Sequence, residues 1–401
     1  MKETGDKIKL HIKEEERNIF KDDVKRRHRI EARSRTVAVM SICMIIIFMI
    51  VIVLPNRFTA NTTDVSLAWM LDTVKLRAGS ILHAIGSGEQ LDQQYVIFRF
   101  LITALVGAAL SISGAVYQGS LRNSLASPST LGVQSGGVLG GTIYVIFFAT
   151  YSSGSIKTSE LAEQMSQMNI FERYAQTFSI LLGCFLGVAV IIAISTIVGH
   201  GKVSSLALVL CGTVFGSLIS GAVGLVQYYY LIHDLYGTKT YVLRYLMLGT
   251  FDNVMTLEDL ALIGIPIIIG MTAVILLRNK LNILCFGEDE AKAMGMNIKL
   301  VRYSLIAIVT AMTAIVISFC GQIGFVGFII PHVARRLVGA DFKYLVPASA
   351  ILGATIMMLV YYIGTALDYA QNINFVTSLV GGTVFLIMVV KYRKKSNADW
   401  A

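Results

Sequence analysis

The chain has 401 residues, of which 55% are hydrophobic and only 15% are charged. A soluble domain carries about a quarter charged residues, so this composition, with a mean hydropathy of +0.68, excludes an ordinary soluble protein. Several apolar runs reach the ~20 residues that a helix needs to cross a bilayer, which predicts a polytopic membrane protein. The net charge of +9 does not indicate nucleic-acid binding, because basic residues concentrated in cytoplasmic loops give the same balance.

The chain begins with a charged and polar extension, residues 1–36, which carries a basic cluster around Arg26 and Arg27. The first apolar run starts near Val37, too late for a cleavable signal peptide. We expect a solvated cytoplasmic extension, with a membrane-surface or partner-binding tail as the alternative. The transmembrane domain is expected over residues 37–395.

The apolar runs predict an all-α fold of about ten transmembrane helices. The expected spans are 37–54, 100–117, 132–150, 176–198, 206–229, 258–277, 303–320, 323–338, 345–366 and 374–391. With ten spans and a cytoplasmic N-terminus, the basic segments 200–202, 278–302, 335–343 and 391–395 all fall inside, as the positive-inside rule requires. Both termini are then cytoplasmic, and the polar segments 55–97, 151–174 and 230–256 lie outside.

An internal repeat is visible in the apolar sequence. Residues 103–114, ahead of Gln118-Gly119, resemble residues 310–321, ahead of Val326-Gly327. The copies begin spans two and seven, an odd offset, so they should have opposite orientations in the membrane. This pattern predicts two inverted five-helix repeats, an arrangement common in transporters, although apolar segments also resemble one another through composition.

Three motifs carry a family resemblance. The stretch Cys320–Asp341 places glycines at three-residue spacing before Pro331-His332 and Arg335-Arg336. Such glycines allow two backbones to approach closely, and a broken helix survives in a membrane only where it packs on protein or lines a cavity. The stretch resembles a motif of the permease subunits of ABC importers for iron-siderophores, haem and vitamin B12, except that Gln322 stands where the family usually has proline.

The second motif is Ser113–Gly136, an irregular link between two spans. It shares with the family Gln118, Arg122, Asn123, Leu125, Ala126, Pro128, Leu131 and Gly132, while Ser124 replaces a proline. Its backbone must find partners in side chains such as Asn123, Ser127 and Ser129. The resemblance implies that Gln118 and Asn123 belong to the translocation pathway beside the inner gate; a well-capped turn is the alternative. Ser204 and Ser205 lie where the resemblance to the cobalamin permease places a cytoplasmic gate, and they also suit a simple turn.

The third motif is the loop 281–295, with Gly287, Glu288, Ala291 and Gly295 matching the family. Its residues predict a short helix that starts near Glu288, with acids at its positive end, and closes at Gly295. The resemblance implies docking to the ATPase, whereas a solvated amphipathic connector is the alternative. Arg99 matches one of the family's arginines that face the substrate-binding protein, and it also suits a snorkelling anchor at the membrane surface.

The sequence predicts no catalytic residues and no metal site. It contains no Gly-x-x-x-x-Gly-Lys-[Ser/Thr] loop, His-Glu-x-x-His or Gly-x-Ser-x-Gly motif, and its five cysteines form no Cys-x-x-Cys pair. The spans hold almost no ionisable residues, which disfavours an ion-coupled secondary transporter. A membrane enzyme is disfavoured by the missing catalytic cluster.

The resemblance therefore implies the permease subunit of an ABC importer in a bacterial cell membrane, for an iron-siderophore or related iron chelate, with haem and cobalamin as alternatives. The expected partners are cytoplasmic ATPase subunits that use ATP, an extracytoplasmic substrate-binding protein, a second permease in a homodimer or heterodimer, and the lipid bilayer. No cofactor is expected on this chain.

Overall fold

The structure is a computed structural model, and it describes residues 30–46, 92–149, 170–199, 205–233, 238–251, 257–286, 288–366 and 372–393. A helix covers residues 30–46. The following helices are α3 (Asp92–Ser120), α4 (Val133–Phe147), α6 (Ile170–Val198), α7 (Ser205–His233), α8 (Thr238–Leu248), α9 (Leu257–Phe286), α10 (Glu288–Ala293), α11 (Ile298–Cys320), α12 (Val326–Val338), α13 (Phe342–Ala366) and α14 (Ile373–Arg393). The described residues contain no strand, which confirms the predicted all-α class.

The long helices have the dimensions of membrane spans. Six described helices, namely α3, α6, α7, α9, α11 and α13, are long and apolar enough to cross a bilayer, and α4 and α14 provide shorter apolar helices. Helix α12 has 13 residues, about 20 Å at 1.5 Å per residue, which is less than the ~30 Å hydrocarbon core. The chain is a polytopic membrane protein, while the count of ten spans stays a prediction.

The two copies of the predicted repeat lie in antiparallel helices. Arg302, near the start of α11, donates from Nε to the carbonyl of Ser120 at the end of α3 (3.0 Å). Further along α11, the Val309 carbonyl accepts from the hydroxyl of Ser113, earlier in α3 (3.5 Å). Each helix is followed by an irregular link and a short helix, α4 after α3 and α12 after α11. Both features agree with the opposite orientation expected from the sequence.

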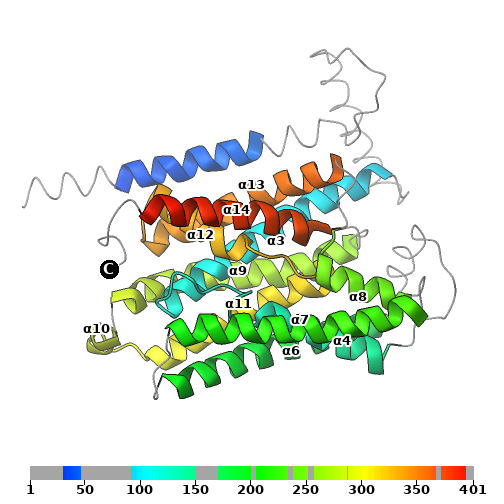
Figure 1. Cartoon of the computed structure of the whole chain (residues 1–401). Helices are drawn as coiled ribbons and strands as arrows, with labels where there is room; N and C mark the ends of the chain where they lie inside the picture. Colours follow the sequence, from blue (N-terminus) through cyan, green and yellow to red (C-terminus); the bar gives the residue numbers. More distant parts are fainter. Residues whose placement is uncertain are drawn as a thin grey trace, which may run out of the picture.

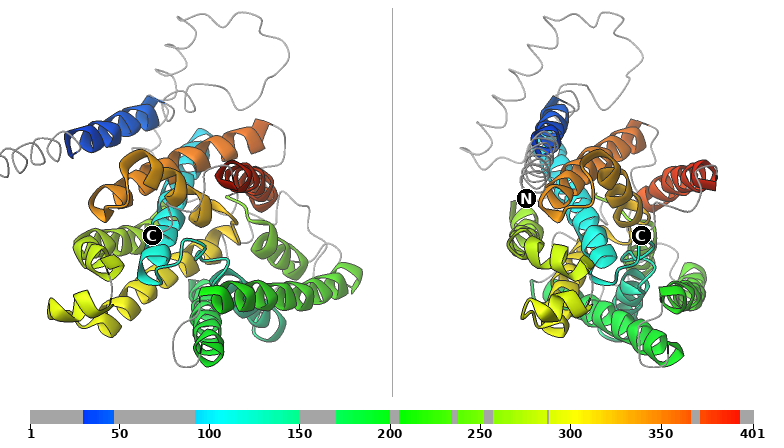
Figure 2. Two further views of the ribbon diagram at one scale, coloured as in Figure 1. Left: turned by 60° about the vertical axis from the view of Figure 1, so that its left-hand side comes forward. Right: turned by 90° about the vertical axis from the view of Figure 1, so that its left-hand side faces the viewer.

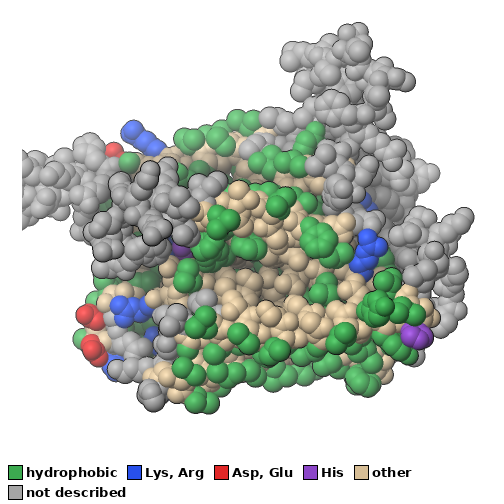
Figure 3. Space-filling view, viewed as in Figure 1, with side chains coloured by type: hydrophobic (Ala, Val, Ile, Leu, Met, Phe, Trp, Pro, Cys, Tyr) green, Lys and Arg blue, Asp and Glu red, His purple; other side chains and the backbone are tan. Residues whose placement is uncertain are grey.

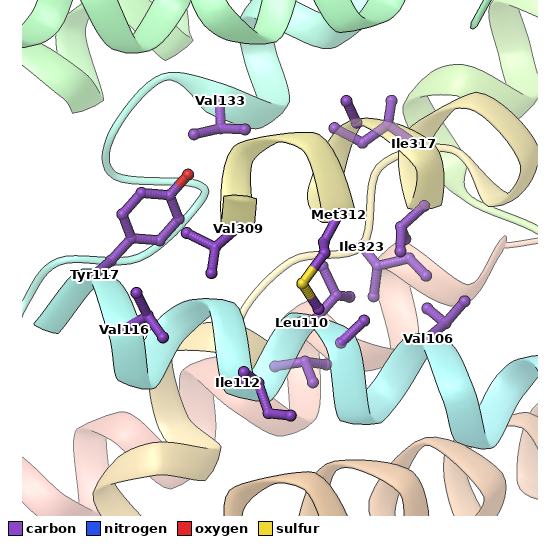
Figure 4. Packing of buried hydrophobic residues seen from close by; sticks show 14 of the residues in the cluster. Val106, Leu110, Ile112, Val116, Tyr117, Val133, Val309, Met312, Ile317 and Ile323 are labelled. Atoms are coloured by element: carbon purple, nitrogen blue, oxygen red, sulfur yellow. The ribbon is translucent and has the colours of Figure 1, made fainter. Parts of the chain in front are cut away.

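Helix α3 forms the core of the bundle. It packs against α9, α11, α12 and α13 and runs through the middle of the molecule in Figure 2. Figure 4 shows its apolar side chains meeting those of α11, with Val116 and Tyr117 near Val309. Tyr117 is fully buried, and its hydroxyl lies 2.7 Å from the hydroxyl oxygen of Thr310. A buried phenol needs such a partner, because an unpaired hydroxyl in an apolar interior is costly.

Two helices occupy segments that were expected to be loops. Residues 230–256 were expected to form an outer loop, but α8 occupies Thr238–Leu248. Its residues Val242, Leu243 and Leu246 are fully buried, at the spacing of one helical face, so packing stabilises a helix there. Helix α9 likewise continues to Phe286, into the segment expected as a basic loop.

The bundle has two distinct ends. We call the end that carries α10 the α10 end; it also holds the last turns of α3, α9 and α12 and the first turns of α11 and α13, on the left of Figure 1. On the face shown in Figure 3, charged side chains gather near the two ends, and between them hydrophobic side chains lie among backbone and uncharged polar atoms. This distribution is the one that a bilayer requires, because ionised groups avoid the hydrocarbon region.

Candidate functional site

Glycines bring α12 directly against α3. A Cβ on Gly114 of α3 would overlap the carbonyl oxygen of Gly327 in α12. The close backbone approach predicted from the glycine spacing is therefore confirmed at Gly327. Pro331 lies inside α12, so this short helix lacks one backbone donor where it packs on protein.

Side-chain amides form hydrogen bonds with the backbone of the link between α11 and α12, residues 321–325. Gln134 of α4 donates from Nε2 to the carbonyl of Ile323 (2.5 Å). Asn374 of α14 accepts through Oδ1 from the amide of Gly324 (3.0 Å). Irregular backbone at membrane depth needs such partners, so α4 and α14 together fix the broken helix.

Gln322 has a structural role at the position where the family usually has proline. Its backbone amide donates to the carbonyl of Leu246 in α8 (2.9 Å), and the amide of Thr250 donates back to the carbonyl of Cys320 (2.9 Å). Proline has no N–H and would lose the first of these bonds. Gln322, unlike proline, therefore connects the end of α8 to the link through a backbone hydrogen bond.

The link between α3 and α4, residues 121–132, is held by its own side chains, as predicted. Asn123 accepts through Oδ1 from a backbone amide two residues further on (2.9 Å), and the hydroxyls of Ser127 and Ser129 lie 2.9 Å apart. The sequence analysis missed Thr130, whose hydroxyl oxygen accepts from the amide of Ser127 (2.8 Å). Asn123 acts here as a turn residue, and its place beside a gate stays a prediction.

Gln118 joins α3 to α12. Its side chain is buried; Nε2 donates to the carbonyl of Phe328 (3.2 Å) and Oε1 accepts from Arg335 (3.2 Å). One amide therefore holds two turns of α12, including one member of the predicted Arg335-Arg336 pair. A residue in this position resists sliding of α12 along α3, and its role in a gate stays a prediction.

Helices on both sides of α10 are tied to the bundle. Asn282 of α9 donates from Nδ2 to Asp341 (2.8 Å) and accepts through Oδ1 from the amide of Phe342, the first residue of α13 (2.9 Å). On the other side of α10, the bond from Arg302 to Ser120 connects α11 with α3. A displacement of α10 would reach α13 through α9 and α3 through α11.

The loop 281–295 contains the short helix predicted from its sequence. Helix α10 begins at Glu288 and ends at Ala293. Gly295 follows with φ 74°, a left-handed conformation that favours glycine, and its amide donates to the carbonyl of Lys292 (2.9 Å). Ala291 is fully buried, which fixes α10 against α9 and α11. Gly287 lies outside the described residues, and only the backbone of Glu288 is described.

An exposed surface surrounds α10. We call it the coupling patch, and it consists of the exposed side chains Phe286, Asp289, Glu290, Met294 and Leu300. The sequence analysis recognised the acids but missed the apolar members, whose signal is a set of large hydrophobic residues flanking a charged turn. Exposed apolar side chains next to charged ones at the end of a bundle are available for a protein-protein contact.

The remaining predicted site residues lie apart from this end. Arg99 is half-buried in α3 at the opposite end of the bundle, and α3 begins about two turns earlier, at Asp92. Its backbone carbonyl accepts from the hydroxyl of Thr103 (2.6 Å). Ser204 lies outside the described residues, and Ser205 is the first residue of α7. The gate role of the two serines stays a prediction.

A buried ion pair escaped the sequence analysis. Arg173, near the start of α6, bonds to Asp259, near the start of α9, and Asp259 is fully buried. Both residues lie near helix ends, so hydropathy alone did not show that the carboxylate turns inward. Within the described residues, no group of three or more His, Cys, Asp and Glu side chains offers a metal site.

Comparison with known proteins places this architecture in a family. Residues 60–391 match the FecCD transport family. The molybdate import system permease protein of Haemophilus influenzae is 33% identical over 79% of this chain and 88% of its own length. The hemin transport system permease protein of Yersinia pestis is 28% identical over 74% of this chain and 82% of its own.

A cobalamin import system permease protein of Halobacterium salinarum is 27% identical over 73% of this chain and 71% of its own length. A solved structure described as an inward-facing conformation of a metal-chelate type ABC transporter is 26% identical, with a TM-score of 0.65, and the match covers 90% of this chain and all of that one. The chain therefore belongs to the FecCD transport family, as a multi-pass membrane permease of an ABC importer.

Proposed function

We propose that this permease forms, together with a second permease, the path by which an ABC importer moves an iron-siderophore or related iron chelate, and that separate ATPase subunits supply the energy. The observation that carries the proposal is the coupling patch. It is exposed around a short helix that is itself anchored by the buried Ala291. A surface that is fixed to the bundle in this way would transmit the movement of a bound partner.

The hydrogen bonds made by the helices on both sides of α10 would carry that movement into the bundle. Binding of ATP would draw the partner subunits together and displace α10. Asn282 would pass the displacement from α9 to α13, and Arg302 would pass it from α11 to α3. Because α3 packs along α12 and Gln118 fixes their register, the ends of the central helices would move as a unit.

The distribution of charge favours a cytoplasmic position for the α10 end. Most described Lys and Arg residues lie there, whereas the opposite end has Arg99, Arg173, Lys239 and Arg244. The residues at the α10 end are Arg33, Arg35, Arg122, Arg278, Lys280, Lys292, Lys299, Arg302, Arg335, Arg336, Lys343, Lys391 and Arg393. Basic residues are retained on the cytoplasmic side of membrane proteins, so the binding protein would dock at the opposite end, where Arg99 lies.

Helix α7 provides a wall for a path between two copies. Only 17% of the most apolar stretch of α7 is buried inside the bundle, against 83% for that of α3. One stripe carries small and hydroxylic residues at helical spacing, the exposed Thr213, Ser217 and Gly221 and the half-buried Gly224, and a Cβ on Gly221 would meet nothing within 4 Å. A second permease facing this stripe would enclose an uncharged path that passes a large chelate without holding it.

The relatives support a chelated metal as cargo. They include permeases named for haem, cobalamin and Fe(3+)-citrate, and the solved relative is of the metal-chelate type. Molybdate is a second candidate, because the relative named for it is 33% identical to this chain. The two cargoes differ in size and charge, so the binding protein, rather than the uncharged stripe of α7, would distinguish them.

ATP hydrolysis by the assembled system tests the proposal. The purified permease is reconstituted with and without its ATPase subunit, and the binding protein is loaded with a ferric chelate or with molybdate. We expect hydrolysis only when the ATPase subunit is present, with stimulation by the ferric-chelate form. Stimulation by the molybdate form alone would assign the cargo to an oxyanion, and hydrolysis by the permease alone would overturn the division of roles.

A further inference from the structure

A hollow of about 510 Å³ lies between α6 and α9. Both helices pack along α11, which forms its floor and leaves the space between the two helices open. Apart from Arg173, Tyr174 and Thr177, all near the start of α6, the lining is apolar. Its main side chains are Leu181, Leu262, Ile265, Pro266, Ile315 and Phe319. We call this space the α6–α9 groove.

The groove is polar at one end only. Arg173, paired with the buried Asp259, lies at the end where α6 and α9 begin. Thr177 of α6 lies one turn further in, and its hydroxyl is 2.6 Å from that of Ser318 in α11. Beyond this point the lining is apolar, so the groove has the same polarity profile as a lipid: a polar head and an apolar tail.

The length of the groove matches one leaflet. Its lining extends along α6 from Arg173 to Leu181 and along α11 from Phe319 back to Ala311, which in each case is about 12 Å at a rise of ~1.5 Å per residue. Half of a ~30 Å hydrocarbon core is ~15 Å. The groove therefore begins at the end of the spans and reaches close to the middle of the membrane.

The surroundings of the groove face the bilayer. Side chains next to it on the outer faces of both spans are large, apolar and exposed, among them Phe178, Leu182, Ile268 and Ile269. A hydrophilic cargo has no hydrogen-bond partners along such a wall, and burial of polar groups without partners is unfavourable. An empty hollow would forfeit the dispersion contacts of its lining.

We propose that the α6–α9 groove binds one acyl chain of a membrane phospholipid, whose headgroup region lies beside Arg173. The chain fills the gap that α6 and α9 leave above α11 and packs against Pro266 and Ile315. The positive charge of Arg173 is balanced by Asp259, so the site selects for an acyl chain rather than for an anionic headgroup. The site depends on the membrane position of the bundle and not on the cargo.

Photolabelling tests the site directly. The assembled transporter is placed in phosphatidylcholine bilayers that contain phosphatidylcholine with a diazirine in its acyl chain, and the adducts are mapped by mass spectrometry. We expect adducts to concentrate on residues 174–181, 262–266 and 311–319. In Ala311→Phe a ring fills the inner end of the groove, and the adducts on residues 178–181 and 311–315 are lost. Ala193→Phe, on an exposed face of α6 outside the groove, keeps them.

Three results would overturn the proposal. Labelling spread evenly over all exposed apolar helices, including α7, would show ordinary annular lipid. Adducts at the inner end of the groove that persist in Ala311→Phe would show that the chain lies elsewhere. An absence of groove adducts in wild type would show that a protein segment covers the site. No cargo and no ATP enter this measurement, so its failure is distinct from a failure of the proposed transport function.

Discussion

At the scale of single residues, the effect of replacing a glycine depends on which atoms lie opposite it. Gly114 faces the backbone of Gly327 across α3 and α12, whereas Gly221 faces open space on α7. The two positions look alike in the sequence, since both are glycines within apolar helices. The structure therefore predicts opposite effects for the same substitution.

Gly114→Ala should lower the thermal stability of the purified permease, because its methyl group overlaps the carbonyl of Gly327 and forces the helices apart. Overpacking of this kind costs about 1–3 kcal/mol. Gly221→Ala is the matched control and should be neutral or stabilising, because alanine favours helix by about 1 kcal/mol. Thermal melts followed by size-exclusion chromatography in detergent compare the two. Equal melting temperatures for both variants would contradict the close contact.

The Arg173–Asp259 pair gives a second prediction. Removing one partner breaks a charge-assisted bond that is partly shielded from water, so Asp259→Ala should destabilise the protein by about 1.5–3 kcal/mol. Replacing both partners with apolar residues of similar size, as in Arg173→Met with Asp259→Leu, should recover most of that loss. The same thermal melts compare single and double variants. A double variant as unstable as Asp259→Ala would show that the pair has a further role.

At the scale of elements, the position of α10 depends on the buried Ala291 and on the left-handed conformation of Gly295. Gly295 has φ 74° and donates its amide to Lys292. Proline fits neither the angle nor the bond, since its φ is near −65° and it lacks the N–H. Asparagine tolerates the left-handed conformation.

Gly295→Pro should therefore displace α10 and abolish co-purification with the ATPase and cargo uptake, while the protein still inserts in the membrane. Gly295→Asn, its matched control, should retain most of both activities. Pull-down of the ATPase subunit and uptake in cells measure the effect. If Gly295→Pro binds the ATPase and transports as wild type does, α10 is not the coupling element.

The elements also show what the sequence can and cannot predict. The helix at α10 and the glycine contact at Gly327 follow from local signals, namely capping residues and motif spacing. Helix α8 was missed, because a short amphipathic helix stabilised by packing is hidden in a tyrosine-rich loop. Asp259 was missed for a related reason: burial depends on α6, which is distant in the sequence. The exposure of Met294 and Leu300 likewise depends on how α10 packs.

At the scale of the whole molecule, the two ends of the bundle differ in charge. The α10 end holds the coupling patch and most of the basic residues, and the opposite end holds Arg99. An importer needs two docking surfaces, because the binding protein and the ATPase act from opposite sides of the membrane. The family resemblance assigns docking of the binding protein to Arg99, which is half-buried at that end, and this role stays a prediction.

Arg99→Glu should weaken docking of the binding protein more than Arg99→Ala does, because repulsion is added to the lost attraction. An exposed pair contributes about 0–1 kcal/mol, and more where the interface excludes water. The difference between the variants should shrink at high salt. Affinity for the reconstituted transporter at low and high ionic strength tests this. If both variants dock like wild type at low salt, Arg99 serves as a membrane anchor.

Uptake into sealed vesicles tests the central account most directly. The permease is reconstituted with its ATPase subunit enclosed with ATP, and a binding protein loaded with a radiolabelled ferric chelate is added outside. The account predicts accumulation that requires both ATP and the ATPase subunit and that is insensitive to dissipation of the proton gradient. Uptake driven by an ion gradient, without the ATPase subunit, would contradict it.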